Sequence, residues 1–194
     1  MSSPTLSLRR VSLAVLATAL VAVLGAGCGS QTVATTVSGT ASPLPRSAVP
    51  YLASRTQPLT AADLLEDGPQ PGLQDDLARW KFLGGAQRTF QGHSHKLQLV
   101  VSRTLMFGTP GGAREYVQYV KQHAADVIGS SPTIAPLQSQ DRAGWMITPA
   151  GCACHMAQPA LVGLVSRGPR VSWLEVNGPQ ATAAALKALL DQAP

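Results

Sequence analysis

The structural class of this chain is decided by one stretch, TPGGAREYVQYVKQHAADVI, which runs from Thr109 to Ile128. Thr109 can cap a helix, Pro110 suits the first helical position, and Gly129 can end the helix. Apolar side chains recur in this stretch at helical spacing, with polar ones facing away: Ala113, Tyr116, Val117, Val120, Ala124 and Val127, against Arg114, Glu115, Gln118, Lys121 and Gln122. The stretch therefore predicts an amphipathic helix packed on a core.

Strand-like segments lie on both sides of this helix. Residues 86–91 and 96–107 flank the polar turn Gly92-His93-Ser94-His95, and residues 143–148 form a shorter run. Alternation of Leu99 and Val101 with Gln98 and Ser102 predicts a strand with one buried face.

The clearest hairpin joins residues 160–165 to residues 171–176 across the turn at 166–170. In its second strand, Trp173 is expected to face inward with Val171, opposite Ser172.

A second main helix is expected after Gly178-Pro179, with an apolar stripe made of Ala185, Leu186, Leu189 and Leu190. Shorter helical turns are expected at residues 61–66 and 74–80. Strands grouped before and after a central helix, with a helix closing the chain, predict the α+β class. We expect an antiparallel sheet with two main helices packed on it.

The same region resembles a known family. The resemblance rests on Phe107-Gly108-Thr109 leading into Ala113-Arg114-Glu115-Tyr116, then on Arg167-Gly168 before Val171, and on the alanine-rich final helix. Their order is similar to that of the small actinobacterial lipoproteins of the LpqN kind. The resemblance implies a PsbP-like fold, in which helices pack on a curved antiparallel sheet.

The first residues have the pattern of an export signal. Arg9 and Arg10 precede a stretch from Val11 to Leu24 whose polar residues are Ser12 and Thr18. As a helix, this stretch would be about 21 Å long, short of the roughly 30 Å hydrocarbon core of a bilayer. It therefore favours the apolar region of a signal peptide over a membrane span.

Small residues, Gly25-Ala26-Gly27, stand directly before Cys28 and resemble the lipobox of bacterial lipoproteins, although Gly25 occupies the position where that family prefers leucine. The resemblance implies a diacylglyceryl group on the Cys28 thiol, removal of residues 1–27 and further acylation, commonly with palmitate. It implies a protein held on the extracytoplasmic face of the cell membrane by its N-terminal lipid. Ordinary signal-peptidase cleavage, which would give a secreted protein, is the alternative.

Residues 28–50 are expected to form a flexible linker after the lipidated cysteine. Ser, Thr, Pro and Gly dominate this segment, which has no acidic and no aromatic side chain. Such a composition buries too little apolar surface to offset the entropy of ordering. Residues 51–194 are then predicted to form a single α+β domain.

One cluster in the domain invites a chemical interpretation: Cys152, Cys154, His155 and Met156. Outside the cytoplasm, Cys152 and Cys154 can form a disulfide, although residues two apart make a strained one. The two can also be small buried residues. Alternatively, two thiolates, an imidazole and a thioether suit copper(I) or zinc. His93 and His95 would complete such a metal site only if the fold brings them close; otherwise they are exposed turn residues.

The remaining chain carries no recognisable catalytic motif, such as a nucleophile elbow, a zinc-protease helix or a phosphate-binding loop. The net charge of +5 is modest and partly due to the signal segment, so nucleic-acid binding is not expected. His123, Tyr116 and Tyr119 are interpreted as packed residues, and the paired acids at 66–67 and 75–76 as a solvated face. The sequence thus predicts a non-enzymatic binding, sensing or scaffold module without a cofactor, which binds an envelope protein or ligand. A metal-handling or redox lipoprotein is the alternative.

Overall fold

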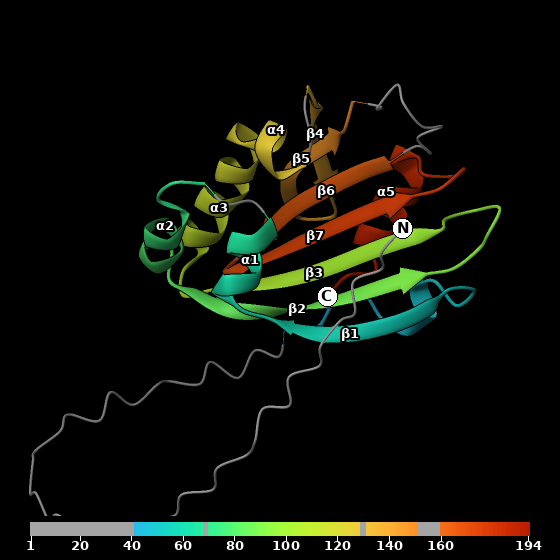
Figure 1. Ribbon diagram of the computed structural model, residues 1–194, viewed down its shortest axis with the longest axis horizontal. Coiled ribbons are helices and arrows are strands. Elements are labelled where there is room, and N and C mark those ends of the chain that lie inside the picture. The colour runs from blue at the N-terminus through green and yellow to red at the C-terminus, as the bar shows by residue number, and fades with distance from the viewer. Residues whose placement is uncertain (1–40, 68–69, 129–130, 151–159) are drawn as a thin grey trace, which may run out of the picture. The chain divides into compact units, whose positions relative to one another are not determined.

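The computed structural model describes residues 41–67, 70–128, 131–150 and 160–194 (Figure 1). The strands in these ranges are β1 (Ala53–Leu59), β2 (Phe82–Gln91), β3 (Leu99–Phe107), β4 (Thr133–Ser139), β5 (Arg142–Thr148), β6 (Ala160–Arg167) and β7 (Arg170–Asn177). The helices are α1 (Ala61–Asp67), α2 (Leu73–Arg79), α3 (Pro110–Gln122), α4 (Ala124–Val127) and α5 (Ala183–Leu190), with a 3-10 turn at Arg46–Ala48.

All described strands belong to one antiparallel sheet in the order β1-β2-β3-β7-β6-β5-β4. The two predicted hairpins, β2–β3 and β6–β7, meet at the centre of this sheet because β3 pairs with β7. Helix α3 follows β3 and leads the chain to β4, at the far edge of the sheet. The predicted α+β class is confirmed.

The sheet has a hydrophobic cluster on each face. Val171 and Trp173 lie in the cluster that contains the buried residues of α3, while Leu174 and Val176 lie in the cluster that contains the leucines of α5. The two main helices therefore cover opposite faces of the sheet. Ser172 is buried as well, with 3% of its surface exposed.

The expectation of a single buried face on β3 is wrong for the same reason. The residues of β3 that are fully buried include Val100 and Ser102, whereas Leu99 and Val101 are half-buried. Simple alternation of apolar and polar residues describes a sheet with one solvated face, and this sheet is packed on both.

Helix α3 begins as the sequence predicted. The Oγ1 atom of Thr109 accepts a hydrogen bond of 3.0 Å from the backbone N–H of Gly112, and Pro110 occupies the first turn. The helix ends earlier than predicted, at Gln122, because His123 has non-helical angles (φ −106°, ψ 22°). The backbone N–H of His123 still donates to the carbonyl oxygen of Tyr119 at 2.9 Å, and the His123 Nδ1 atom lies 3.0 Å from the same oxygen. The short helix α4 then begins.

The two edge strands, β1 and β4, are not predicted by the sequence pattern. Most of β1 is exposed and polar, and each of the two strands contains a proline, Pro58 or Pro136. Proline lacks an N–H group and is tolerated at a sheet edge, where one side of the strand needs no donor. These segments are strands because a neighbour pairs with them, which local composition does not reveal.

The predicted linker also ends too late. Leu44 and Val49 are 0% and 1% exposed, and both belong to the cluster on the α5 face of the sheet. Residues 42–49, called the strap below, are thus part of the folded body rather than of a linker that reaches Pro50. The described part of the chain from residue 41 onward forms one compact unit.

Polar contacts hold the strap on strand β3. The backbone N–H of Leu44 donates to Ser102 Oγ at 3.0 Å, and Thr104 Oγ1 donates to the carbonyl oxygen of Ser42 at 2.9 Å. Arg88 of β2 also donates to the carbonyl oxygen of Leu44. Ser102 and Thr104 are nearly inaccessible to solvent, so these bonds satisfy polar groups that burial would otherwise leave without partners.

Candidate functional site

The predicted chemical residues lie mostly outside the described ranges. Cys28 and the cluster of Cys152, Cys154, His155 and Met156 are among them, so lipidation, the disulfide and the metal site all stay predictions. His93 and His95 are exposed in the connection between β2 and β3. Within the described ranges, no group of three or more His, Cys, Asp or Glu side chains is placed to hold a metal ion.

Two grooves flank helix α3. The α2 groove, of about 600 Å³, is lined by Asp76, Arg79, Trp80, Gly111, Arg114, Glu115, Gln118, Tyr119, Gln122 and His123. The β5 groove, of about 450 Å³, is lined by Arg114, Val117, Gln118, Pro136, Leu137, Gln138, Asp141, Ala143, Gly144, Trp145, Ser166 and Gly168. Because Arg114 and Gln118 line both grooves, the polar face of α3 forms the ridge between them.

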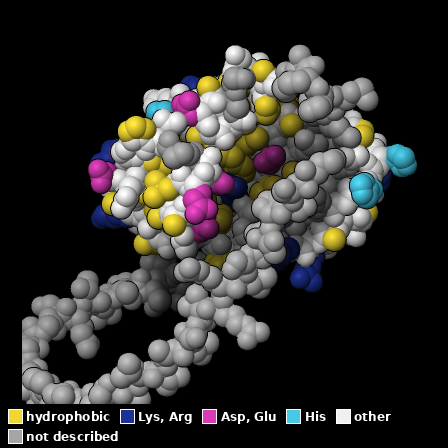
Figure 2. Space-filling model, in the orientation of Figure 1, with side chains coloured by type: hydrophobic (Ala, Val, Ile, Leu, Met, Phe, Trp, Pro, Cys, Tyr) yellow, Lys and Arg dark blue, Asp and Glu magenta, His cyan; other side chains and the backbone are white. Residues whose placement is uncertain are grey.

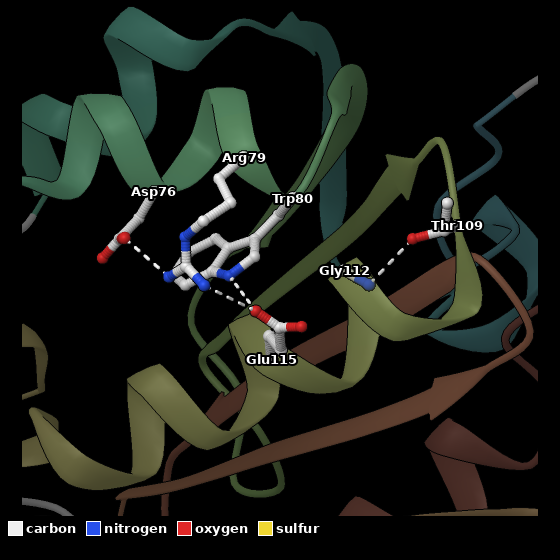
Figure 3. A network of polar contacts seen from close by, with 6 residues as sticks. All are labelled: Asp76, Arg79, Trp80, Thr109, Gly112 and Glu115. Carbon is white, nitrogen blue, oxygen red and sulfur yellow. Dashed lines mark hydrogen bonds and ion pairs between the residues drawn. The ribbon is translucent and has the colours of Figure 1, made fainter.

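A polar network fixes one wall of the α2 groove (Figure 3). Glu115 of α3 accepts a hydrogen bond of 2.8 Å from Trp80 Nε1 and one of 3.1 Å from Arg79 Nη1. Arg79 also pairs with Asp76 on its own helix at 2.7 Å, and this contact raises the pKa of the Arg79 guanidinium. The network ties the end of α2 to α3.

Beneath this network lies an aromatic layer. The ring of buried Trp80 meets Tyr116 and Tyr119 edge to face, with centroids 6.0 and 5.4 Å apart. The ring of His123 stacks on Tyr119 at 4.3 Å, and burial raises the pKa of the Tyr119 hydroxyl. Tyr116, Tyr119 and His123 are thus packed residues, as the sequence predicted.

Trp145 gives the β5 groove an aromatic wall, and a lysine that is not among the lining residues contacts its ring. Lys121 of α3 places its Nζ atom 3.6 Å from the centroid of the Trp145 ring, within the range of a cation–π contact. At the hairpin end, Asp141 pairs with Arg167 at 3.0 Å. Lys121 makes no ion pair with a described acidic residue, and the ring is the contact that its ammonium group makes.

Arg114 is the distinctive group of the ridge. Its side chain is exposed and forms no ion pair within the described ranges, whereas its neighbour Glu115 is engaged by Arg79 and Trp80. Arg114, Gln118 and Lys121 follow one another at helical spacing along the solvent side of α3. They offer a guanidinium, an amide and an ammonium group to anything that lies along the helix.

Sequence reasoning placed Arg114, Gln118 and Lys121 on the outward face of the helix but assigned them no role. That face becomes a candidate site only because α2 and the β4–β5 hairpin rise on either side of it. No hydrogen bond joins a histidine to a hydroxyl or carboxylate among the residues that the structure describes. The guanidinium, amide and ammonium groups of Arg114, Gln118 and Lys121 suit binding by charge and hydrogen bonding.

None of the helices in the described ranges is sufficiently long and apolar to span a bilayer. No family model matches the chain, and the comparison with curated proteins gives no match. Among solved structures, the chain is similar to the extracellular domain of PknH from Mycobacterium tuberculosis, with 13% identity and a TM-score of 0.47 over 76% of this chain and 86% of that one.

Proposed function

We propose that this chain is a lipid-anchored, non-enzymatic binding module on the outer face of a bacterial cytoplasmic membrane. The observation that carries the binding part is the pair of grooves that meet at Arg114, an exposed cation without a described ion-pair partner. In this proposal, an envelope protein or ligand lies across α3 and brings an acidic group to Arg114. The lipobox-like residues before Cys28 support the anchor.

The anchor is tested with Cys28→Ser. We expect this variant to lose the acyl groups from its N-terminal peptide in mass spectrometry, and its processed form to move from the membrane fraction to the soluble fraction, because stable anchoring needs covalent acyl chains. Cys152→Ser is the matched control and is expected to stay acylated and membrane-bound. An unmodified N-terminal peptide in the wild-type protein would contradict the proposal.

The binding surface is tested with a photo-crosslinking residue at Gln118, on the ridge between the grooves. In cells, we expect a discrete adduct that loses at least about 90% of its intensity when Arg114→Glu is added, because an acidic partner then meets a repulsive charge at that position. The same crosslinker at Ala184, an exposed position on α5, is the control and is expected to give no such adduct. An adduct that Arg114→Glu leaves unchanged would exclude Arg114 from the interaction.

A second candidate function, a metal-handling or redox lipoprotein, is favoured by the cluster of Cys152, Cys154, His155 and Met156. These donors suit copper(I) or zinc. Elemental analysis and a thiol count on protein purified without oxygen separate the two candidates. A stoichiometric metal together with two titratable thiols would favour this second function. The absence of both the metal and the thiols would eliminate it.

A further inference from the structure

A single acidic residue, Glu175, lies on the α3 face of the sheet, in the central strand β7. Its cross-strand partners are apolar on both sides, Val101 of β3 and Val162 of β6. Trp173, two residues earlier in β7, faces the same side and belongs to the cluster under α3. The carboxyl group of Glu175 thus emerges from a largely apolar part of the sheet.

Part of the α3 face of the sheet lies beyond the helices. Helices α1, α3 and α4 cover one end of the strands, and β3, β7 and β6 continue past them (Figure 1). Figure 2 shows a hollow on this side of the molecule, with hydrophobic side chains in it and acidic and basic ones among them. Glu175, Val101 and Leu99 are all half-buried, so they are partly accessible to a small molecule.

Glu175 has no hydrogen-bond or ion-pair partner among the described residues. The nearest cation, Arg103 of β3, is already engaged: it pairs with Asp67, donates from Nε to Gln87 at 2.6 Å, and lies 5.3 Å from the centroid of the Trp173 ring. Burial raises the pKa of the Glu175 carboxyl, although the charge of Arg103 lowers it. A half-buried carboxyl group without partners is a frequent mark of a ligand site.

We propose that the hollow binds a small amine, whose ammonium group pairs with the Glu175 carboxylate and whose apolar body contacts the half-buried Val101 and Leu99. Charge complementarity selects the ammonium group, and the apolar neighbours select a hydrocarbon body. None of the residues lining the α2 and β5 grooves takes part, so this site is independent of the function proposed above and can fail without affecting it.

The same contacts exclude an acidic group on the ligand. A phospholipid amine or an amino acid would bring a phosphate or carboxylate close to Glu175, where it needs a cation. Arg103 is committed to Asp67, Gln87 and Trp173, and no other described cation is paired with this part of the face. The structure thus favours a free amine without an acidic group over a lipid headgroup.

The test is calorimetric titration of the full chain with hexylammonium. Glu175→Gln, which keeps the shape and removes the charge, is expected to weaken binding roughly tenfold or more, the effect of losing one charge-assisted hydrogen bond. Glu66→Gln, an exposed acid on α1, is the matched control and is expected to bind like the wild type. Hexanol and hexanoate are expected to bind more weakly than hexylammonium.

Two further experiments test the apolar contact and whether the ligand is a free amine or a lipid headgroup. Shortening the probe to butylammonium should weaken binding by about fourfold for each methylene removed. Val101→Thr, nearly the same shape with a hydroxyl group, should reduce this dependence on chain length. Equal affinity of wild type and Glu175→Gln for hexylammonium, or hexanoate binding as well as the amine, would overturn the proposal. Vesicles containing phosphatidylethanolamine that bind through Glu175 would overturn the choice of a free amine.

The stability of the same variant without ligand gives an independent readout. Because the folded state raises the pKa of Glu175, folding is disfavoured while the group is ionised, and this cost disappears as the pH falls through the raised pKa. The charged groups that act on Glu175 are Arg103 and Asp67. We therefore expect Glu175→Gln to raise Tm by a few degrees at pH 7 and to leave it unchanged below the ordinary pKa of glutamate. A lower Tm at pH 7 would mean that the carboxylate is already paired.

Discussion

Replacement of Arg142 by methionine is expected to lower the free energy of unfolding by about 3 kcal/mol, the cost of losing two buried hydrogen bonds from a charged donor to backbone carbonyl groups. Arg142 begins β5 and is 4% exposed. Its Nη1 atom donates to the carbonyl oxygen of Ala193 at 3.0 Å and its Nη2 atom to that of Leu190 at 2.6 Å. Methionine fills much of the same space but cannot donate to either carbonyl group: that of Ala193 loses its side-chain donor, and that of Leu190 keeps only the 3.0 Å bond from the backbone N–H of Ala193.

The position of Arg142 explains why its removal should be costly. The guanidinium lies against the C-terminal end of α5, where the helix dipole favours a positive charge. Burial lowers the pKa of Arg142, which reflects the cost of placing the charge there, while Asp191 acts in the opposite direction. Ser139 donates to the Asp191 carboxylate at 2.6 Å, so the β4–β5 turn holds the end of α5 at a second point.

Equilibrium unfolding in urea, followed by circular dichroism, measures this effect. Arg167→Met is the control, since the Arg167 side chain is 65% exposed in its ion pair with Asp141 and should contribute less than about 1 kcal/mol. Arg142→Lys should fall between the wild type and Arg142→Met, because one ammonium group cannot reproduce the planar pair of donors. Similar losses for Arg142→Met and Arg167→Met would show that the contacts with α5 contribute little.

The second large effect is expected for Leu44→Ala. This substitution should lower the free energy of unfolding by about 3 kcal/mol, which is within the range measured for fully buried leucines. Leu44 is 0% exposed and packs in the cluster that contains Phe90, Val100 and Leu186. The smaller alanine side chain leaves a cavity over the sheet and weakens the packing of the strap against it. A residue in a true linker would show no such effect.

The matched control for Leu44→Ala is Arg46→Ala, an exposed position two residues along the same strap, where a change below about 0.5 kcal/mol is expected. Limited proteolysis adds a second measurement, because loosening of the strap should expose residues 42–49 to cleavage before the rest of the domain. Equal stability of Leu44→Ala and wild type would mean that the strap detaches from the sheet without consequence.

The elements predicted correctly carry their determinants in a short stretch of sequence. Thr109 and Pro110 mark the start of α3, and the turn before Arg170 marks the hairpin of β6 and β7. The strap is different: Leu44 and Val49 are isolated apolar residues among Ser, Pro and Arg, and they are buried only because β3 offers Ser102 and Thr104 as partners for the backbone. Such partners, distant in sequence, cannot be read from composition.

The candidate site shows the same limit. The outward position of Arg114 on its helix could be predicted from periodicity, but the walls of the two grooves come from α2 and from β4–β5. Glu175 was not singled out at all, since a glutamate alternating with apolar residues in a strand normally faces solvent. Its unusual environment arises from Val101 and Val162 on two neighbouring strands, which sheet order alone brings together.

In the lipid-anchored form proposed above, the strap limits how far the domain can stand from the bilayer. If acyl chains hold Cys28, then only residues 29–41 separate the lipid from Ser42, where the chain first bonds to β3. At full extension this span is roughly 45 Å long, and as a random coil about 20 Å. A partner of the grooves would therefore be met within one or two domain diameters of the membrane surface. Lateral encounters with other membrane-bound proteins would then be favoured over capture of molecules deep in the cell wall.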